Sequence, residues 1–177
     1  MLYVFLADGF EEIEAIAPID ILRRGNLPLL TVGVTGKTVH GAHGLTVEAD
    51  ITMDEVEPDK AQALILPGGI PGATNLEADS RLSALLDFAA ENNILLCAIC
   101  AAPMILGKKG FLRGKEAVAY PGYEKDLDGA KIGKGVCRDG NIITAQGAGV
   151  ALPFAFAILQ AFGGDADAMR RAMQYDA

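Results

Sequence analysis

Residues 94–103, ILLCAICAAP, place a cysteine at the point where a short apolar run ends. Residues 94–99 form a continuous apolar run of strand length, which predicts a strand buried on both faces. Residues 101–103, Ala-Ala-Pro, follow Cys100, and small residues with a proline in the first turn favour the start of a helix. The stretch therefore predicts a sharp strand-to-helix turn with Cys100 at its apex, a connection typical of parallel sheets.

The same alternation of apolar runs and amphipathic segments continues in both directions along the chain. Further strands are predicted at residues 2–6, 28–34, 63–66, 117–119, 135–137 and 142–145, and helices at 11–24, 80–92, 152–162 and 165–173. Residues 38–49, interrupted by glycines, predict a hairpin. Strands that alternate with helices indicate an α/β fold with a doubly wound, mostly parallel sheet between helices. The length of 177 residues fits one domain, which we predict over residues 1–177.

Composition and charge exclude several classes of partner. The net charge is −8 and the 15 Lys and Arg residues are scattered, which argues against a nucleic-acid partner and an anionic membrane surface. No apolar stretch is as long as a membrane-spanning helix, which needs about 18 residues. The three cysteines show neither disulfide nor zinc spacing, which suits a reducing compartment, so we expect a cytoplasmic protein. Cys97 forms a C-x-x-C with Cys100, but it lies inside an apolar run and is predicted to pack in the core.

Three segments are expected to meet at the carboxyl ends of the strands, where ligands bind in open α/β sheets. These segments are residues 8–14, residues 67–72 and Cys100. A thiol at the start of a helix is activated because the helix N-terminus favours an anion and the turn projects the side chain outward. The alternative is that Cys100 is a buried structural cysteine. The sequence around Cys100 does not by itself distinguish this interpretation from a reactive thiol.

The loop of residues 66–72, LPGGIPG, and the acid Glu14 are the candidate partners of the thiol. Paired glycines let backbone N–H groups approach a ligand closely, so the loop can supply an oxyanion donor, although a plain turn is the alternative. We expect Ile13 and Ala17 to face the packed side of their helix, which directs Glu14 toward the crevice. A Glu14 that burial keeps protonated can donate a hydrogen bond to the thiolate.

The two histidines and one tyrosine are weaker candidates. His40 and His43 lie in a glycine-flanked loop without a neighbouring cysteine or carboxylate in the sequence, so no metal site is predicted. Tyr120 follows a predicted strand, and it either faces the crevice or packs in the core.

The motifs GFEEIE (residues 9–14), LPGG (66–69) and AICAAP (98–103), in this order, resemble the ThiJ/PfpI superfamily, and most closely its parkinsonism-associated deglycase (DJ-one) branch. The resemblance extends over nearly the whole chain, including residues 147–149. It implies a flavodoxin-like sandwich of the class I glutamine amidotransferase type, and a homodimer. It also implies roles for residues of the site: Cys100 as the reactive thiol, Glu14 as its protonated partner, the N–H groups of Gly69 and Ala101 as the oxyanion site, and Gly68 as part of the lining.

The chain departs from this family at two positions. Protease-like members carry a histidine directly after the cysteine, where this chain has Ala101, so a peptidase would lack its general base. The deglycase branch often carries a histidine where this chain has Tyr120. His43 and Arg24 match basic positions near the dimer interface in that branch, which makes them candidates for the lining of an anion site.

These observations favour a cysteine-dependent glyoxalase or protein deglycase that acts on methylglyoxal-like α-oxoaldehydes or their protein adducts, without a metal or organic cofactor. The alternative is an oxidative-stress sensor or chaperone whose Cys100 is reversibly oxidised. A flavin-binding role rests on fold analogy alone.

Overall fold

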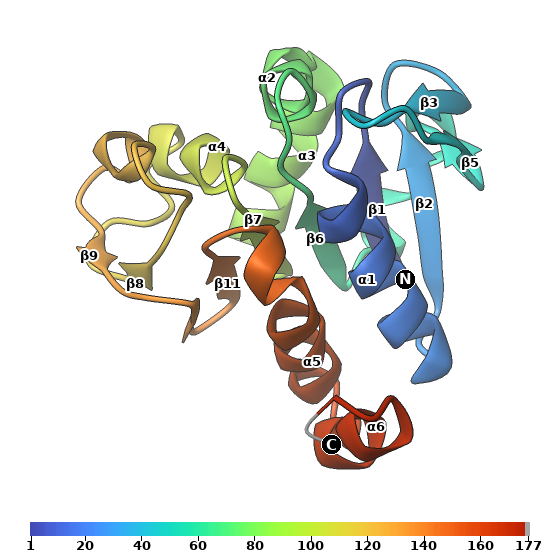
Figure 1. The fold of residues 1–177 in the computed structure, drawn as a ribbon. Helices are drawn as coiled ribbons and strands as arrows, with labels where there is room; N and C mark the ends of the chain where they lie inside the picture. The colour runs from blue at the N-terminus through green and yellow to red at the C-terminus, as the bar shows by residue number, and fades with distance from the viewer. Residues whose placement is uncertain (176–177) are drawn as a thin grey trace.

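A seven-stranded sheet with the order β10-β11-β7-β6-β1-β2-β5 runs through the computed structural model (Figure 1). The model describes residues 1–175; residues 176 and 177, the end of the predicted domain, lie outside them. The strands are β1 (Leu2–Leu6), β2 (Leu29–Gly33), β5 (Ile51–Thr52), β6 (Ala63–Leu66), β7 (Leu95–Ile99), β10 (Val136–Asp139) and β11 (Ile142–Ala145). Only the β10–β11 pair is antiparallel within this sheet. The predicted doubly wound, mostly parallel sheet is confirmed.

Helices cover both faces of the sheet. They are α1 (Glu12–Arg24), α2 (Gly72–Ala78), α3 (Ser80–Glu91), α4 (Pro103–Lys108), α5 (Ala151–Ala161) and α6 (Ala166–Ala172). Because successive side chains of a strand point to opposite faces, β1 serves two cores. Leu2 and Val4 pack with buried residues of α1 and α5, whereas Tyr3 and Phe5 pack with those of α2, α3 and α4. The carboxyl ends of β1, β6 and β7 therefore lie side by side between the two layers.

Helix α1 buries a different face from the one that the sequence predicted. Ala15, Ile19 and Leu22 form its buried stripe at i, i+4 and i+7, the spacing of an amphipathic helix. Ile13 is 57% exposed and Ile16 is 40% exposed, so the expectation that Ile13 faces the packed side is wrong. Apolar residues occur on both sides of this helix, and the sequence alone does not tell which side meets the sheet.

Two-stranded sheets and short elements complete the fold. β3 (Thr38–His40) and β4 (Thr46–Glu48) pair antiparallel, which confirms the predicted hairpin. β8 (Glu116–Ala117) pairs with β9 (Lys131–Ile132), so the strand predicted at residues 117–119 is shorter and lies outside the central sheet. Helix α2 was missed because its start was read as part of the glycine-rich loop.

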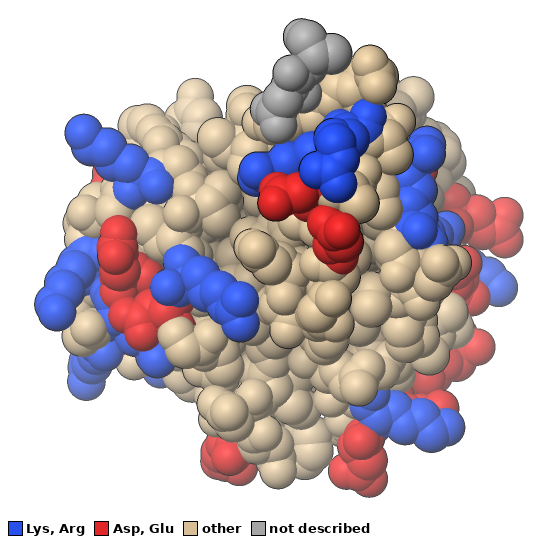
Figure 2. All heavy atoms as spheres, turned by 90° about the horizontal axis from the view of Figure 1, so that it is seen from below, with Lys and Arg blue, Asp and Glu red and all other residues tan. Residues whose placement is uncertain are grey.

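The outer surface is of mixed charge. On the face shown in Figure 2, Lys and Arg side chains lie beside Asp and Glu rather than in one continuous basic patch. Ion pairs such as Arg113 with Asp128 and Lys109 with Asp87 also join opposite charges at the surface of the chain. Within residues 1–175, no helix is long and apolar enough to cross a membrane.

Candidate active site

Cys100 lies at a sharp turn directly after β7. Its φ angle is +66°, a left-handed conformation that is costly for a residue with a side chain, by roughly 1–2 kcal/mol. Hydrogen bonds hold the backbone on both sides: the Cys100 N–H donates to the Ala145 carbonyl oxygen at 2.9 Å, and the Cys100 carbonyl oxygen accepts from the Tyr120 N–H at 2.8 Å. The thiol is therefore projected from the end of β7, as the sequence predicted.

Glu14 lies in the first turn of α1 and is 1% exposed. The Gly68 N–H donates to its Oε2 at 3.0 Å. Burial raises the pKa of Glu14 to about 7, although the nearby Cys100 side chain and the N–H groups of Gly68 and Ala148 oppose the rise. A proton near neutral pH is thus held within reach of the sulfur atom.

The Gly68–Gly69 loop fits between Glu14 and Cys100 because it lacks side chains. A Cβ atom on Gly68 would lie 2.5 Å from Glu14 Oε2 and 2.6 Å from Cys100 Cβ, both too close for van der Waals contact. Gly69 has a φ of +88°, which favours glycine. The Glu11 N–H donates to the Gly68 carbonyl oxygen at 3.0 Å and fixes the loop against the start of α1.

The thiol of Cys100 is subject to opposing influences. Burial, and then the carboxylate of Glu14, raise its pKa, whereas hydrogen bonds from the N–H groups of Gly69 and Ala101 lower it. The sequence predicted activation by the start of the next helix, but the six-residue α4 begins only at Pro103. Two acids in contact titrate as a pair, and the pair with one proton carries one negative charge. With the proton on Glu14, its O–H can donate to a thiolate that also accepts from both N–H groups.

Replacing Gly68 with alanine is expected to disrupt this arrangement. The added methyl group must displace either the Glu14 carboxyl group or the Cys100 backbone, so we expect the free energy of unfolding to fall by about 1–3 kcal/mol. The Cys100 thiol should also react with iodoacetamide at a different rate. Thermal unfolding and alkylation kinetics measure both effects.

Gly149→Ala is the control for stability, because a Cβ atom there meets no heavy atom within 4 Å. Equal melting temperatures for the Gly68→Ala and Gly149→Ala variants would contradict the close approach inferred at Gly68.

His43 and Arg24 lie away from the thiol. The His43 Nδ1 atom is 2.9 Å from Glu12 Oε2 and 3.3 Å from Glu11 Oε2, so the fold brings to it two carboxylates that are distant in the sequence. These three side chains bring their ligand atoms within 4.8 Å of one another, a spacing that a metal ion could bridge. Arg24 pairs with Asp20 in the last turn of α1, ten residues or about 15 Å along the helix from Glu14. Within one copy of the chain Arg24 therefore lies away from Cys100, and its place in an anion site near a dimer interface stays a prediction.

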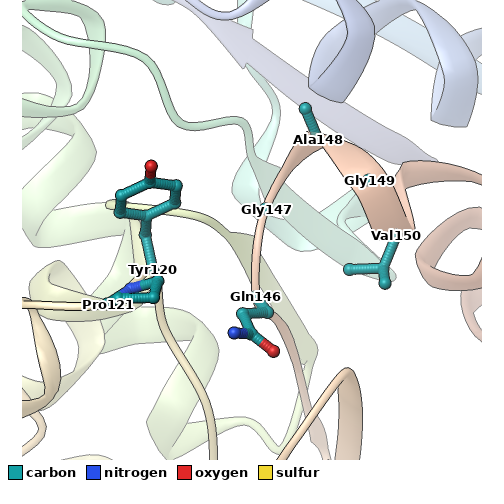
Figure 3. A pocket seen from close by; sticks show the side chains of 7 residues that line it. All are labelled: Tyr120, Pro121, Gln146, Gly147, Ala148, Gly149 and Val150. Carbon is teal, nitrogen blue, oxygen red and sulfur yellow. The ribbon is translucent and has the colours of Figure 1, made fainter.

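Tyr120, whose N–H donates to the Cys100 carbonyl oxygen, lines a cavity of about 370 Å³ (Figure 3). The cavity is also lined by Pro121 and by residues 146–150, which connect β11 to α5. The sequence named Tyr120, but it assigned no role to Gln146, Ala148 or Val150. Gly147 was the available signal, since a Cβ atom there would lie 3.3 Å from the Tyr120 ring and 4.0 Å from Glu14 Oε1.

Comparisons with known proteins found a matching family and similar folds. Residues 1–161 match the DJ-1/PfpI family. Protein DJ-1 homolog B of Arabidopsis thaliana is 37% identical over 90% of this chain, which spans only 37% of that relative. A deglycase of Pyrococcus abyssi is 32% identical over 81% of this chain and 87% of its own length. The oxidized structure of Toxoplasma gondii DJ-1 superposes with a TM-score of 0.92 at 31% identity and covers 98% of this chain and 97% of its own.

Proposed function

Since the chain belongs to the DJ-1/PfpI family, we propose that it is a cysteine-dependent enzyme that converts methylglyoxal-like α-oxoaldehydes, or their protein adducts, to 2-hydroxy acids. The observation that carries this proposal is the position of the buried Glu14 carboxyl group beside Cys100, since a Cβ atom on Gly68 would collide with both side chains. The deglycase name of the Pyrococcus relative supports the same class of reaction. No metal or organic cofactor is invoked in the steps below.

The first step is the addition of the Cys100 sulfur to the aldehyde carbon. A bond forms between sulfur and C1, and the carbonyl oxygen becomes a hemithioacetal hydroxyl group after taking up a proton. The N–H groups of Gly69 and Ala101 lower the pKa of the Cys100 thiol, so they are the donors that would stabilise negative charge developing beside the sulfur. This role is part of the proposal.

In the second step Glu14 moves a proton. Its carboxylate removes the hydrogen from C1 to give an enediol and returns a proton to C2, so C1 is oxidised and C2 is reduced within one molecule. The product is a 2-hydroxyacyl thioester on Cys100. Water then hydrolyses the thioester, which releases lactate from methylglyoxal and regenerates the thiol. With Ala101 after the cysteine, the adjacent histidine of a peptidase is missing.

The direct test is lactate formation from methylglyoxal by the purified chain, without glutathione and after treatment with a chelator. Proton NMR follows the lactate methyl doublet. We expect lactate in proportion to enzyme concentration, and its absence would overturn the proposed activity.

A second candidate function is reversible oxidation of Cys100 in a stress response. It is favoured by the exposure of the three thiols: Cys97 and Cys137 are buried, whereas Cys100 is partly exposed. The Toxoplasma relative was solved in an oxidized form. Mass spectrometry after mild peroxide treatment tests this function, and it fails if Cys100 stays reduced while another cysteine reacts. A cytoplasmic location stays a prediction.

We also propose that the chain forms a homodimer through the outer side of α1. Ile13 and Ile16 are exposed there, and the exposed Leu45 lies close by, because its N–H donates to Glu12 Oε1 at 3.4 Å. An apolar surface of this kind is buried when two copies meet about a two-fold axis. Ile13→Asp combined with Ile16→Asp is therefore expected to yield a monomer in light scattering coupled to gel filtration.

Ile132→Asp is the matched control, since Ile132 is equally exposed on β9 and its replacement should leave the mass unchanged. A monomeric wild-type chain would contradict the dimer, and a dimeric double variant would place the interface elsewhere.

A further inference from the structure

We infer that the cavity lined by Tyr120, Pro121 and residues 146–150 selects uncharged α-oxoaldehydes that carry an aryl or bulky alkyl group. This inference rests on the proposed function and names its substrate class. The cavity is hereafter called the Tyr120 cavity. Its position, its chemistry and its size each contribute to the inference.

The Tyr120 cavity lies next to the reacting pair. A Cβ atom on Gly147, which lines the cavity, would lie 3.3 Å from the Tyr120 ring and 4.0 Å from Glu14 Oε1, so this glycine lies between the cavity wall and the carboxyl group. The Tyr120 N–H also donates to the Cys100 carbonyl oxygen at 2.8 Å. A substituent on an aldehyde bonded to the Cys100 sulfur can therefore extend into this cavity.

The lining of the cavity is uncharged. None of its seven residues is acidic or basic, and the Tyr120 ring, Pro121 and Val150 supply apolar walls. Figure 3 shows the Tyr120 ring opposite the 147–150 segment, with the Gln146 amide at one end of the hollow. The Gln146 Oε1 atom accepts from the Gly135 N–H at 3.3 Å. Its NH₂ group and the Tyr120 hydroxyl group have no partner among residues 1–175, so both are available to a neutral acceptor on a substrate.

This chemistry disfavours a substrate carboxylate. A carboxylate in the cavity would lose water without gaining a cationic partner, and it would lie next to Glu14. An aryl group instead gains contact with the Tyr120 ring, in an offset or edge-to-face arrangement. The volume of about 370 Å³ also exceeds what the methyl group of a three-carbon aldehyde fills. The fit is therefore better for an aryl or branched alkyl substituent.

Turnover of three aldehydes tests this selectivity. We expect kcat/KM for phenylglyoxal to exceed that for methylglyoxal by about tenfold, and that for anionic 4-carboxyphenylglyoxal, which carries a carboxylate on the same ring, to fall below that for phenylglyoxal. Tyr120→Ala should reduce the preference for phenylglyoxal, whereas Tyr120→Phe, which retains the ring, should preserve it. Gln146→Arg places a cation at the cavity and should raise turnover of 4-carboxyphenylglyoxal relative to phenylglyoxal. A phenylglyoxal preference that is unchanged in Tyr120→Ala would overturn the inference.

Alkylation of Cys100 separates a failure of this inference from a failure of the proposed function, because it needs no turnover. The probes are N-phenyliodoacetamide, iodoacetamide and iodoacetate. For each reagent, the rate of reaction with Cys100 is divided by its rate of reaction with glutathione, which corrects for its intrinsic reactivity. We expect the phenyl reagent to react fastest and iodoacetate slowest, with the phenyl advantage lost in Tyr120→Ala. That order together with no turnover of any aldehyde would contradict the proposed enzyme and support the cavity. Equal normalised rates, or a faster iodoacetate, would overturn the selectivity of the cavity even if aldehydes are turned over.

Discussion

Replacement of Cys100 with serine is expected to lower kcat/KM for methylglyoxal by roughly a thousandfold or more, because the variant lacks the thiolate that adds to the aldehyde. A serine hydroxyl group is a far weaker acid, and within residues 1–175 no imidazole contacts this position to activate it. The side chains have similar size, so the hydrogen bonds of Cys100 to Ala145 and Tyr120, which involve only the backbone, should persist. Steady-state lactate formation measures the loss.

Cys137→Ser is the control for this variant. Like Cys100, Cys137 has a thiol beside a carboxyl group, with its sulfur 3.8 Å from Glu116 Oε1, but it is buried and lies on β10 rather than at the end of β7. Its replacement should leave kcat/KM within about twofold. Full activity of Cys100→Ser, or a loss in both variants of equal size, would contradict a nucleophilic role for Cys100.

The strands that the sequence predicted best are those buried on both faces. The predicted bounds 2–6, 63–66 and 142–145 agree with β1, β6 and β11. Continuous apolar runs ended by glycine or a polar residue leave little ambiguity about length, and parallel strands must be covered by helices on both sides. The turn at Cys100 was predictable for the same reason, since the run that ends there cannot continue into solvent.

The parts that the sequence did not predict depend on contacts between distant segments. Glu14 reaches the thiol as predicted, but the reason given was wrong, because Ile13 faces outward and the buried side of α1 is the side that carries Glu14. The pairing of His43 with Glu12 joins residues 31 positions apart. The Tyr120 cavity joins two loops whose proximity only the sheet order reveals. The spacing of apolar residues predicts one helix or strand at a time, so it gives no distance between residues that belong to different elements.

Glu14→Gln also offers a test through stability. Burial raises the pKa of Glu14 in the folded chain from 4.5 to about 7. A group whose folded pKa is raised contributes stability that is fully present below pH 4.5 and is lost as the pH rises through about 7. The loss amounts to up to about 3 kcal/mol. Glutamine does not ionise, so the variant should gain stability relative to wild type between pH 5 and pH 8. If the difference in melting temperature between Glu14→Gln and wild type stayed constant from pH 5 to pH 8, Glu14 would not be buried as the structure describes.

The same substitution is expected to lower kcat/KM for methylglyoxal by about a hundredfold to ten-thousandfold, because it removes the group that moves the proton. In wild type, the reactive thiolate beside a protonated Glu14 exists only when the pair has lost one of its two protons. Activity should therefore rise with pH through about 7, the raised pKa of Glu14. In Glu14→Gln the thiol must lose its proton alone, and burial raises its pKa, so the rising limb should move to higher pH. A pH–rate profile of the variant that keeps its midpoint near 7 would contradict the shared proton, even if the rate itself falls.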